Sequence, residues 1–447
     1  MSSLPSHTER FEHYFRICES LRRFLAAHPH EPAAWIAVPT VAGAVSPAHA
    51  QDLHAQAPLS EAHLQRLLDR PERFTLGARK QEYRMVDRCI SGSMGPNERR
   101  ALDAVFDHLG WQESPTAAPA PASSRRARKL RRKAQALAEG LVDQMREEEV
   151  ELPLPSSRVY ARFLKAADSV ATLEAVVASS GPLVAAVPSM HSLVARALVW
   201  VARQAAVPSV YVPHAPSIGL LELEELPVDY AALRGRMEVE RFAEHGVDPG
   251  RLEVAGNPTV DEARLAELDL GRPPVLALSP FSEDMLVPLV DLVRSVLDDA
   301  VVAPHPRMDR DSVASLCPAG WEIWGGRTYD LLKSGPPMLI QCSSGVALES
   351  LHLGIPTIQL AFPGAVAYPF LREPQVPHAS SPAELRAAID EARAAAASPA
   401  RREELLEWAR AWSHPSGAEA AARVATLLES AAGAAPPGPI WDHWSAV

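Results

Sequence analysis

Apolar and polar positions follow two patterns along the second half of the chain. Short apolar runs that stop abruptly at small or polar residues predict buried strands, and the segments between them carry apolar residues every three or four positions, which predicts helices. The alternation begins near residue 156 and forms two series, one to about residue 262 and one from residue 274 to residue 360. Because such alternation produces parallel sheets covered by helices on both faces, the sequence predicts an α/β protein with two Rossmann-like, doubly wound domains facing a cleft.

The predicted elements of these two series are short. Strands are expected at residues 182–188, 207–213, 251–255, 274–279, 300–303, 338–341 and 357–360. Helices are expected at residues 158–179, 191–205, 238–245, 284–297, 329–332 and 345–353, with closing helices at 382–396 and 401–430. The carboxyl ends of these strands are therefore the positions to search for ligand-binding side chains.

The first part of the chain shows a different pattern. Apolar residues at helical spacing predict helices at residues 10–27, 60–68 and 97–109, and the apolar run at 34–45 is interpreted as a buried strand and turn. We therefore divide the chain into a mainly helical region of unknown role (1–112), a linker and charged helix (113–150), an upstream Rossmann-like domain (151–262), a downstream Rossmann-like domain (263–432) and a tail (433–447). The first region completes the upstream domain or forms a separate module.

The linker and the segment after it have unusual compositions. Residues 114–124 are rich in Pro and small residues, which favours extended chain. Seven Lys or Arg then occur among the nine residues from Arg125 to Lys133, and acidic residues follow at 147–149. One interpretation is a basic helix resting on an anionic membrane surface at the inner membrane face, and the other is a solvated helix.

Composition excludes some classes of function. The chain has 447 residues and a net charge of −11, which argues against a nucleic-acid binder. Its four cysteines (Cys18, Cys89, Cys317, Cys342) have no C-x-x-C spacing, so a zinc site or a disulfide framework is not expected. The first residues lack the apolar core of a signal peptide, and no run reaches the ~18 apolar residues of a membrane span. We therefore expect a cytoplasmic protein.

Candidate binding residues lie after two predicted strands of the second series. His305 and Arg307 flank a proline directly after the strand at 300–303, and arginine can bind a phosphate with two hydrogen bonds. Ser343, Ser344 and Gly345 follow the strand at 338–341 and begin a helix, where hydroxyls and backbone N–H groups can bind phosphate oxygens. A surface loop and a serine helix cap are the structural alternatives. Both loops suit a diphosphate.

Three further positions are candidates in the cleft. Glu349 lies one turn along the same helix, where a carboxylate can bind a pair of ribose hydroxyls. His214 follows the strand at 207–213 and can act as a general base on an acceptor hydroxyl, or simply bind neighbouring loops. The turn G-N-P-T-V-D at 256–261 is interpreted as a domain junction rather than a catalytic site.

Taken in order, these motifs resemble the GT-B glycosyltransferase superfamily. The similarity covers about residues 180 to 430 and consists of P-H-A at 213–215, G-N-P-T-V-D at 256–261, A-P-H-P-R at 303–307, S-S-G-V-A-L-E at 343–349 and G-I-P at 354–356. The families that look nearest are bacterial capsule and surface-polysaccharide transferases, including CDP-glycerol glycerophosphotransferases and the sialyl- and Kdo-transferases. The ordered set is more specific for the fold than for the reaction.

The resemblance implies that residues 151–262 form the acceptor-side domain and residues 263–432 the nucleotide-donor domain, and it implies roles for particular residues. His305, Arg307, Ser343, Ser344, Gly345 and Glu349 would bind the donor nucleotide, and His214 would face the acceptor. Where these families have His-Gly, this chain has His214-Ala215, which puts the base role in doubt. Thr357 stands where many retaining relatives have a second Glu, which favours an inverting reaction. No D-x-D metal site is evident in the matched region, and Asp229 and Asp261 are isolated from other carboxylates, so no metal and no cofactor are expected.

Three functions fit these motifs. The first is a transferase that moves a sugar or sugar-like unit from a CMP-, CDP- or UDP-linked donor to a glycan or lipid-linked acceptor. The second is a non-hydrolysing UDP-sugar 2-epimerase, which is disfavoured because a single Glu349 follows the Ser-Gly loop instead of the double Glu usual in those enzymes. The third is a binding protein that kept the fold and lost the chemistry.

Overall fold

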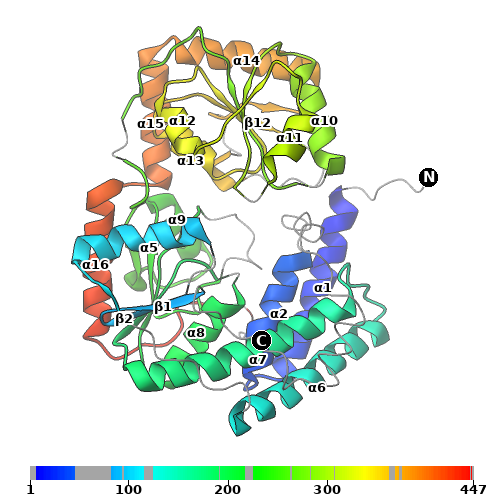
Figure 1. Cartoon of the computed structure of the whole chain (residues 1–447), viewed down its shortest axis with the longest axis vertical. Coiled ribbons are helices and arrows are strands. Elements are labelled where there is room, and N and C mark those ends of the chain that lie inside the picture. Colours follow the sequence, from blue (N-terminus) through cyan, green and yellow to red (C-terminus); the bar gives the residue numbers. More distant parts are fainter. Residues whose placement is uncertain are drawn as a thin grey trace.

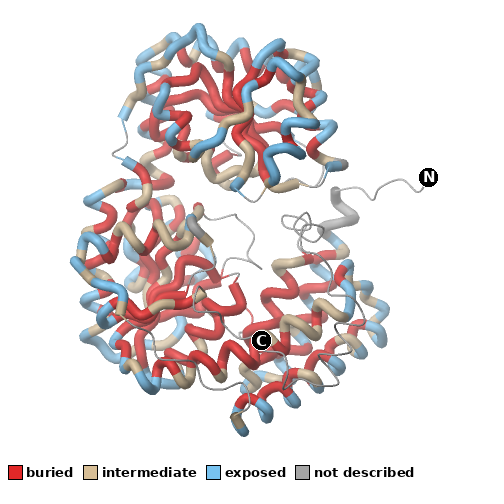
Figure 2. The backbone as a smooth tube through the Cα atoms, in the orientation of Figure 1, coloured by how far each residue is buried: buried red, intermediate tan, exposed pale blue. Residues whose placement is uncertain are grey.

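A computed structural model of the chain describes residues 7–45, 82–92, 95–114, 124–190, 192–216, 225–261, 264–281, 283–306, 308–361, 368–371, 375–442 and 444. These residues form two α/β domains, one above the other in Figure 1, with a helical layer beside the lower domain. Figure 2 shows that buried residues concentrate in the sheets and on the helix faces that cover them. The predicted fold class, two Rossmann-like domains with additional helices, is confirmed.

The first domain is built on a seven-stranded sheet, as far as the described residues show. Its strands lie in the order β3 (Glu113–Ser114), β1 (Tyr83–Val86), β2 (Cys89–Gly92), β4 (Val184–Val187), β5 (Ser209–Tyr211), β6 (Tyr230–Leu233) and β7 (Leu252–Val254). Strands β2 and β4 to β7 pair in parallel, whereas β1 pairs antiparallel with both β2 and β3. The parallel strands are short and mostly buried, as expected for a sheet covered on both faces.

This sheet corrects the predicted boundaries at residues 112 and 150. Strand β2 pairs in parallel with β4, with Cys89 opposite Val184, so residues 83–114 belong to the first domain. Strand β2 is buried at every position, so the backbone N–H and C=O groups on both of its edges need hydrogen-bond partners. Strand β1 pairs with one edge, and β4 of the larger sheet pairs with the other. The predicted helix at 97–109 is confirmed as α5 (Pro96–Leu109), whereas the predicted helix at 60–68 lies outside the described residues.

The second domain has a sheet in which every observed pairing is parallel. Within the described chain its order is β10 (Glu322–Ile323), β9 (Val301–Ala303), β8 (Val275–Ala277), β11 (Leu339–Gln341), β12 (Thr357–Leu360) and β13 (His378–Ala379). The helices of this domain are α10 (Glu283–Arg294), α11 (Arg310–Leu316), α12 (Thr328–Lys333), α13 (Val346–Leu351), α14 (Pro382–Ala396) and α15 (Pro399–Trp412). The loops after β8, β9 and β11 therefore meet at one edge, as the sequence predicted.

A layer of helices covers one face of the first sheet. It contains α1 (His7–Ala27), α2 (Pro32–Val45), α6 (Arg125–Glu147), α7 (Ser156–Ser180) and α8 (Leu193–Gln204), and their apolar faces form one core. The interpretation of residues 34–45 as a strand was wrong, because this segment is the buried helix α2. A continuous apolar run has no periodicity to distinguish a buried strand from a helix buried on most sides.

The basic segment lies in the first turns of α6. The apolar side of this helix is buried against the rest of the layer through Ala127, Leu130, Ala134, Leu137, Ala138, Leu141 and Met145. Arg131 forms a buried ion pair with Asp168 of α7, and Lys133 pairs with Glu31. Any membrane contact would therefore depend on exposed charges and not on an apolar face, and it stays a prediction. The linker residues 115–123 lie outside the described chain.

The chain crosses between the domains twice. The first crossing is the turn at residues 256–261, and the second lies between α15 and α16 (Gly417–Ala432), which packs against α5 and the first sheet. The two crossings contact each other, because Asn257 N–H donates to Pro415 O at 2.9 Å and Gly417 N–H donates to Asn257 O at 3.0 Å. The interpretation of this turn as a domain junction is supported, but α16 belongs to the first domain, not to 263–432.

The first domain also contains α9 (Arg236–Glu244) between β6 and β7 and a single turn at Pro249–Arg251, and the second domain contains a single turn at Pro369–Leu371. The tail also packs on the first domain, where Trp444 is buried and Trp441 pairs with Leu226. Among the helices of the described chain, none is long and apolar enough to cross a membrane.

Candidate functional site

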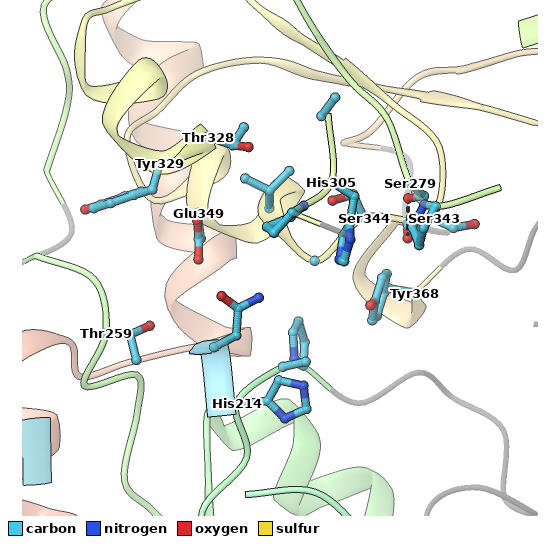
Figure 3. A pocket seen from close by; sticks show the side chains of 18 of the residues that line it. His214, Thr259, Ser279, His305, Thr328, Tyr329, Ser343, Ser344, Glu349 and Tyr368 are labelled. Carbon is cyan, nitrogen blue, oxygen red and sulfur yellow. Dashed lines mark hydrogen bonds between the residues drawn. The ribbon is translucent and has the colours of Figure 1, made fainter. Parts of the chain in front are cut away.

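A cavity of about 780 Å³ lies between the two domains, and both domains line it. His214 lies on the first-domain wall, and His305, Ser343, Ser344 and Glu349 lie on the second-domain wall (Figure 3). Gly345 also lines the cavity. Six residues chosen from sequence motifs up to 135 positions apart, from 214 to 349, are thus brought to one cavity. Arg307 lies outside the described residues.

His305 reaches the cavity because of the strand that precedes it. Strand β9 is fully buried and ends at Ala303, and Pro304 and Pro306 on either side of the histidine cannot donate to a sheet ladder. The carbonyl of His305 accepts a hydrogen bond from Met308 N–H at 2.8 Å, which turns the chain away from the sheet. The imidazole is therefore held at the domain edge, half-buried, where it can meet a phosphate.

The serine loop is held by two polar contacts from neighbouring strand ends. Ser279, two residues after the end of β8, donates its hydroxyl to Cys342 O at 2.8 Å and to Ser343 O at 3.2 Å. Ser343 has a positive φ of 54°, a conformation that is unusual for a residue other than glycine and is often found at functional sites. The brace from Ser279 thus fixes a tight turn that presents two hydroxyls to the cavity. Sequence reasoning missed Ser279.

The helix after this loop differs from the prediction. The backbone N–H of Ser344 donates to Gln341 Oε1 at 2.8 Å, so this N–H group is used within the loop. The N-cap position is Gly345, without a side-chain cap, and α13 has six residues. Such a short helix contributes little dipole, so the predicted binding of a phosphate here would depend on the serine hydroxyls and the His305 imidazole.

Gly345 lies close to Pro216 of the first domain. A Cβ atom at this position would lie 3.2 Å from Pro216 Cδ and 3.7 Å from the Tyr368 hydroxyl. The absence of a side chain therefore keeps a passage open between the serine loop and the first domain. Tyr368 stacks on Phe370 with ring centroids 5.4 Å apart, and burial raises the pKa of the Tyr368 phenol, which keeps this wall neutral.

Glu349 lies on α13 and points into the cavity (Figure 3). Burial raises the pKa of its carboxyl, while Arg327, Arg234 and Arg100 act in the opposite direction. The shortest of these contacts that the structure shows joins Arg327 Nη2 to Glu349 Oε1 at 3.8 Å. The predicted ribose-binding carboxylate thus stands among guanidinium groups from both domains.

These three arginines were missed by the sequence analysis. Arg234 follows β6, a strand that was not predicted because its residues, Y-A-A-L, lack β-branched side chains. Arg100 lies on α5, in the region whose role was unknown, and Arg327 immediately precedes α12. Only the position of Arg234 at a strand end could have been found from sequence, had β6 been recognised.

His214 follows β5 and has a defined ring orientation. Its Nδ1 lies 2.8 Å from Pro188 O, and because a carbonyl only accepts, Nδ1 carries the hydrogen. In the neutral ring Nε2 is then the basic nitrogen. Arg234 Nη2 donates to the carbonyl of His214 at 2.6 Å, which fixes the backbone of this loop. These contacts thus define the tautomer of the His214 ring and the backbone of its loop.

The G-N-P-T-V-D turn does not supply a catalytic carboxylate. The side chain of Asn257 is buried and accepts hydrogen bonds from the N–H and hydroxyl of Thr259, at 3.0 and 2.8 Å. Asp261 is exposed, and its carboxylate lies 3.3 Å from Lys333 Nζ. Across the described residues, no group of three or more His, Cys, Asp or Glu side chains is placed to hold a metal ion.

No protein-family model matches the sequence, and no curated protein matches it. Among solved structures, the chain is similar to the UDP-GlcNAc 2-epimerase of Methanocaldococcus jannaschii in complex with UDP-GlcNAc and UDP, with 13% identity, 60% of this chain and 82% of that chain covered, and a TM-score of 0.41. It is also similar to the calicheamicin glycosyltransferase CalG4, with 16% identity, 63% of this chain and 80% of that chain covered, and a TM-score of 0.42. A third similar structure is the lipopolysaccharide outer core galactosyltransferase WaaB, with 12% identity, 60% of this chain and 81% of that chain covered, and a TM-score of 0.38. At these TM-scores the likeness carries no conclusion about activity.

Proposed function

We propose that this protein is a glycosyltransferase that moves a sugar or sugar-like unit from a nucleotide-activated donor to a hydroxyl acceptor, by inversion and without a metal ion. The observation that carries the proposal is the single cavity, which has His305 and the Ser343–Ser344 hydroxyls on one wall and His214 on the other. Its volume of about 780 Å³ falls in the range of small-molecule sites. The acceptor is a glycan or a lipid-linked molecule, and the families that the motifs resemble act in the bacterial cytoplasm.

The proposed reaction uses His214 as the base. Its Nε2 takes the proton from the acceptor hydroxyl, and the acceptor oxygen forms a bond to the anomeric carbon of the donor. The bond between that carbon and the phosphate oxygen breaks, and its electron pair leaves with the nucleotide. The hydrogen bond from Nδ1 to Pro188 O supports this role, because it holds the ring and stabilises the imidazolium that forms.

On the donor side, the proposed task is to stabilise the negative charge of the leaving phosphate. His305 and the hydroxyls of Ser343 and Ser344 supply hydrogen-bond donors, and the brace from Ser279 holds the loop in place before the ligand arrives. Donors fixed in advance need no reorganisation when charge develops, which is the main source of electrostatic catalysis.

A thermal-shift series tests the donor site. CMP, CDP, UDP and GDP are each added to the whole protein, and we expect one base to raise the melting temperature because it binds only the folded state. At about 100 times its Kd a ligand stabilises by about 2.7 kcal/mol, which is readily measured. The His305→Ala variant should lose most of this shift, and a His108→Ala variant, which changes an exposed histidine on α5, should keep it. An unchanged shift in His305→Ala would remove the main support.

Product analysis separates the remaining alternatives. The His214→Gln variant should bind nucleotide like the wild type and lose transfer, because only the proton acceptor is missing. Conversion of a UDP-sugar to its 2-epimer without any acceptor would favour the epimerase, whose support is the G-N-P-T-V-D turn. Nucleotide binding with neither activity, across the acceptors tried, would favour a binding protein.

A further inference from the structure

The serine loop is attached to the strands on both sides of it. The loop follows β11, which lies between β8 and β12 in the second sheet. On the β8 side, the hydroxyl of Ser279 donates to Ser343 O at 3.2 Å. On the β12 side, the backbone N–H of Ser344 donates to the side chain of Gln341, which in turn contacts Gln359 of β12. The C=O of Ser343 and the N–H of Ser344 belong to one peptide group, so this group is held at both ends.

Gln341 and Gln359 form a buried amide pair between β11 and β12. The two residues are partners in the parallel register, and they are 0% and 2% exposed. Gln341 Nε2 donates to Gln359 Oε1 at 2.6 Å, and Gln359 Nε2 donates to Leu360 O at 2.8 Å. Both glutamines are described residues, and neither of them lines the cavity. Any effect of the pair on a ligand in the cavity must therefore pass through the serine loop.

Backbone groups at the two ends of the pair fix the orientation of both amides. At one end the N–H of Ser344 can only donate, so the oxygen of Gln341 must face it. The NH2 group of Gln341 then faces Gln359, which must present its oxygen. At the other end the carbonyl of Leu360 can only accept, so the NH2 group of Gln359 faces it. Turning either amide over would bring two donors or two acceptors together, so one arrangement satisfies every contact.

The peptide group that is held in this way follows a strained residue. Ser343 has a φ of 54°, and a residue other than glycine keeps such a conformation only where its surroundings impose it. Ser343 and Ser344 both line the cavity (Figure 3). If the peptide group between them were free to rotate, the turn could relax and the two hydroxyls would change direction. The contacts from β8 and β12 thus supply the restraint that the turn needs.

We propose that Gln359 is a positioning residue of the serine loop. Acting through Gln341, it holds the peptide group between Ser343 and Ser344 in the orientation that presents both hydroxyls to a ligand. The consequence for ligand binding rests on the proposed function, whereas the consequence for the loop itself does not. The alternative is a pair of glutamines that only satisfies buried polar groups and stabilises the sheet as a whole.

Backbone hydrogen exchange of the whole protein tests the loop without any ligand. In Gln359→Leu the NH2 group of Gln341 loses its acceptor, so the Gln341 amide is free to turn away from the N–H of Ser344. We expect the amides of residues 342–346 to exchange ~10-fold faster than in the wild type, as the loss of about one hydrogen bond provides. Unchanged exchange of this segment would overturn the inference.

A control variant and a reference strand separate a local effect from a general one. Thr357→Val removes a buried hydroxyl from the same strand, where Thr357 Oγ1 lies 3.4 Å from Ile355 O, and it should exchange like the wild type at residues 342–346. Strand β4 of the first domain is the reference, and its exchange should not change in Gln359→Leu. Faster exchange spread evenly over both domains would assign the glutamines a purely structural role and would contradict the proposal.

Two further variants keep the test decisive if Gln359→Leu does not fold. The double variant Gln341→Leu/Gln359→Leu leaves no buried NH2 group without an acceptor, and it should show the same faster exchange at residues 342–346. Gln359→Glu should restore wild-type exchange at pH 6. Burial raises the pKa of a carboxyl, and the protonated form can accept from Gln341 and donate to Leu360 O as the amide does. Fast exchange in Gln359→Glu at pH 6 would contradict the assigned contacts.

The nucleotide that raises the melting temperature of the wild type connects the loop to function. Measured by calorimetry, its affinity should fall ~10-fold in Gln359→Leu and in the double variant, and should be unchanged in Thr357→Val. Wild-type affinity in Gln359→Leu together with faster exchange of the loop would overturn the role in ligand binding. If no nucleotide stabilises the wild type, the proposed function fails, and the exchange measurements still decide whether Gln359 positions the loop.

Discussion

At the residue scale, local sequence identified several residues on the second-domain wall of the cavity, but not the residues that support them. His305 and Ser343 were found because they follow apolar runs, and both line the cavity. Their supports were not predictable, since Ser279 and Gln341 act through hydrogen bonds that form only when neighbouring strands align. The chemistry of such a site depends as much on these supports as on the groups that face the ligand.

His352, next to the domain junction, gives a residue-scale prediction about pH. It is buried, Nε2 lies 3.2 Å from Ala409 O, and burial lowers the pKa of its imidazole to about 4, with Arg234 and His414 acting in the same direction. An unfolded histidine has a pKa near 6.5. The unfolded state therefore binds the proton first, so stability is complete above about pH 6.5 and is lost as the pH falls toward 4.

The measurement compares urea unfolding at pH 7 and pH 4.5. Between these values the wild type should lose about 2 kcal/mol more of its free energy of unfolding than His352→Gln, which cannot titrate. Parallel pH profiles of the two proteins would show that His352 is not a source of acid sensitivity.

At the element scale, the charged helix α6 illustrates what composition leaves open. Its basic residues suggested either a membrane surface or a solvated helix, and the structure shows that one side of α6 packs against α7 as part of the core. Arg131 belongs to that side and pairs with Asp168, both under 5% exposed. Helical periodicity placed the apolar residues correctly, but it did not indicate that one arginine of the basic run would be buried.

The same pair of helices offers a comparison of buried and exposed ion pairs. Asp168→Asn leaves Arg131 charged and buried, so the free energy of unfolding should fall by about 3 kcal/mol or more. Glu174→Gln removes the partner of Arg126, whose side chain is 53% exposed, and should cost less than about 1 kcal/mol. Urea denaturation of both variants checks the contrast, and equal losses would mean that the buried pair contributes nothing special.

At the scale of the whole molecule, the two chain crossings define how the domains meet. Gly256 has φ +86°, and a Cβ atom there would lie 1.9 Å from Pro415 O. The turn thus depends on glycine twice, for its backbone conformation and for the close approach of the second crossing. The G-N-P motif in the sequence pointed to a turn, and the reason for its glycine appears only when the second crossing is in place.

A pair of glycine variants separates these two effects. Gly110 has a comparable φ of +66°, and a Cβ atom there would meet no atom within 4 Å. Gly110→Ala should therefore lower the free energy of unfolding only by the backbone strain, about 1 kcal/mol. Gly256→Ala adds a collision with the other crossing and should cost at least ~2 kcal/mol more. The free energy of unfolding in urea is the measurement, and similar losses in the two variants would contradict the tight junction.

By itself the sequence determined the strand–helix series, the edge at which the loops gather, and the residues His214, His305, Ser343, Ser344 and Glu349 that reach the cavity. These follow from local patterns, because an apolar run and the residue that ends it are neighbours in the chain. Tertiary structure decided the rest. Residues 83–114 join the first sheet, α16 returns to it, and Arg100, Arg234 and Arg327 converge from two domains. Local sequence patterns could not predict these contacts, because they arise when sheet edges pair and segments more than 90 residues apart pack together.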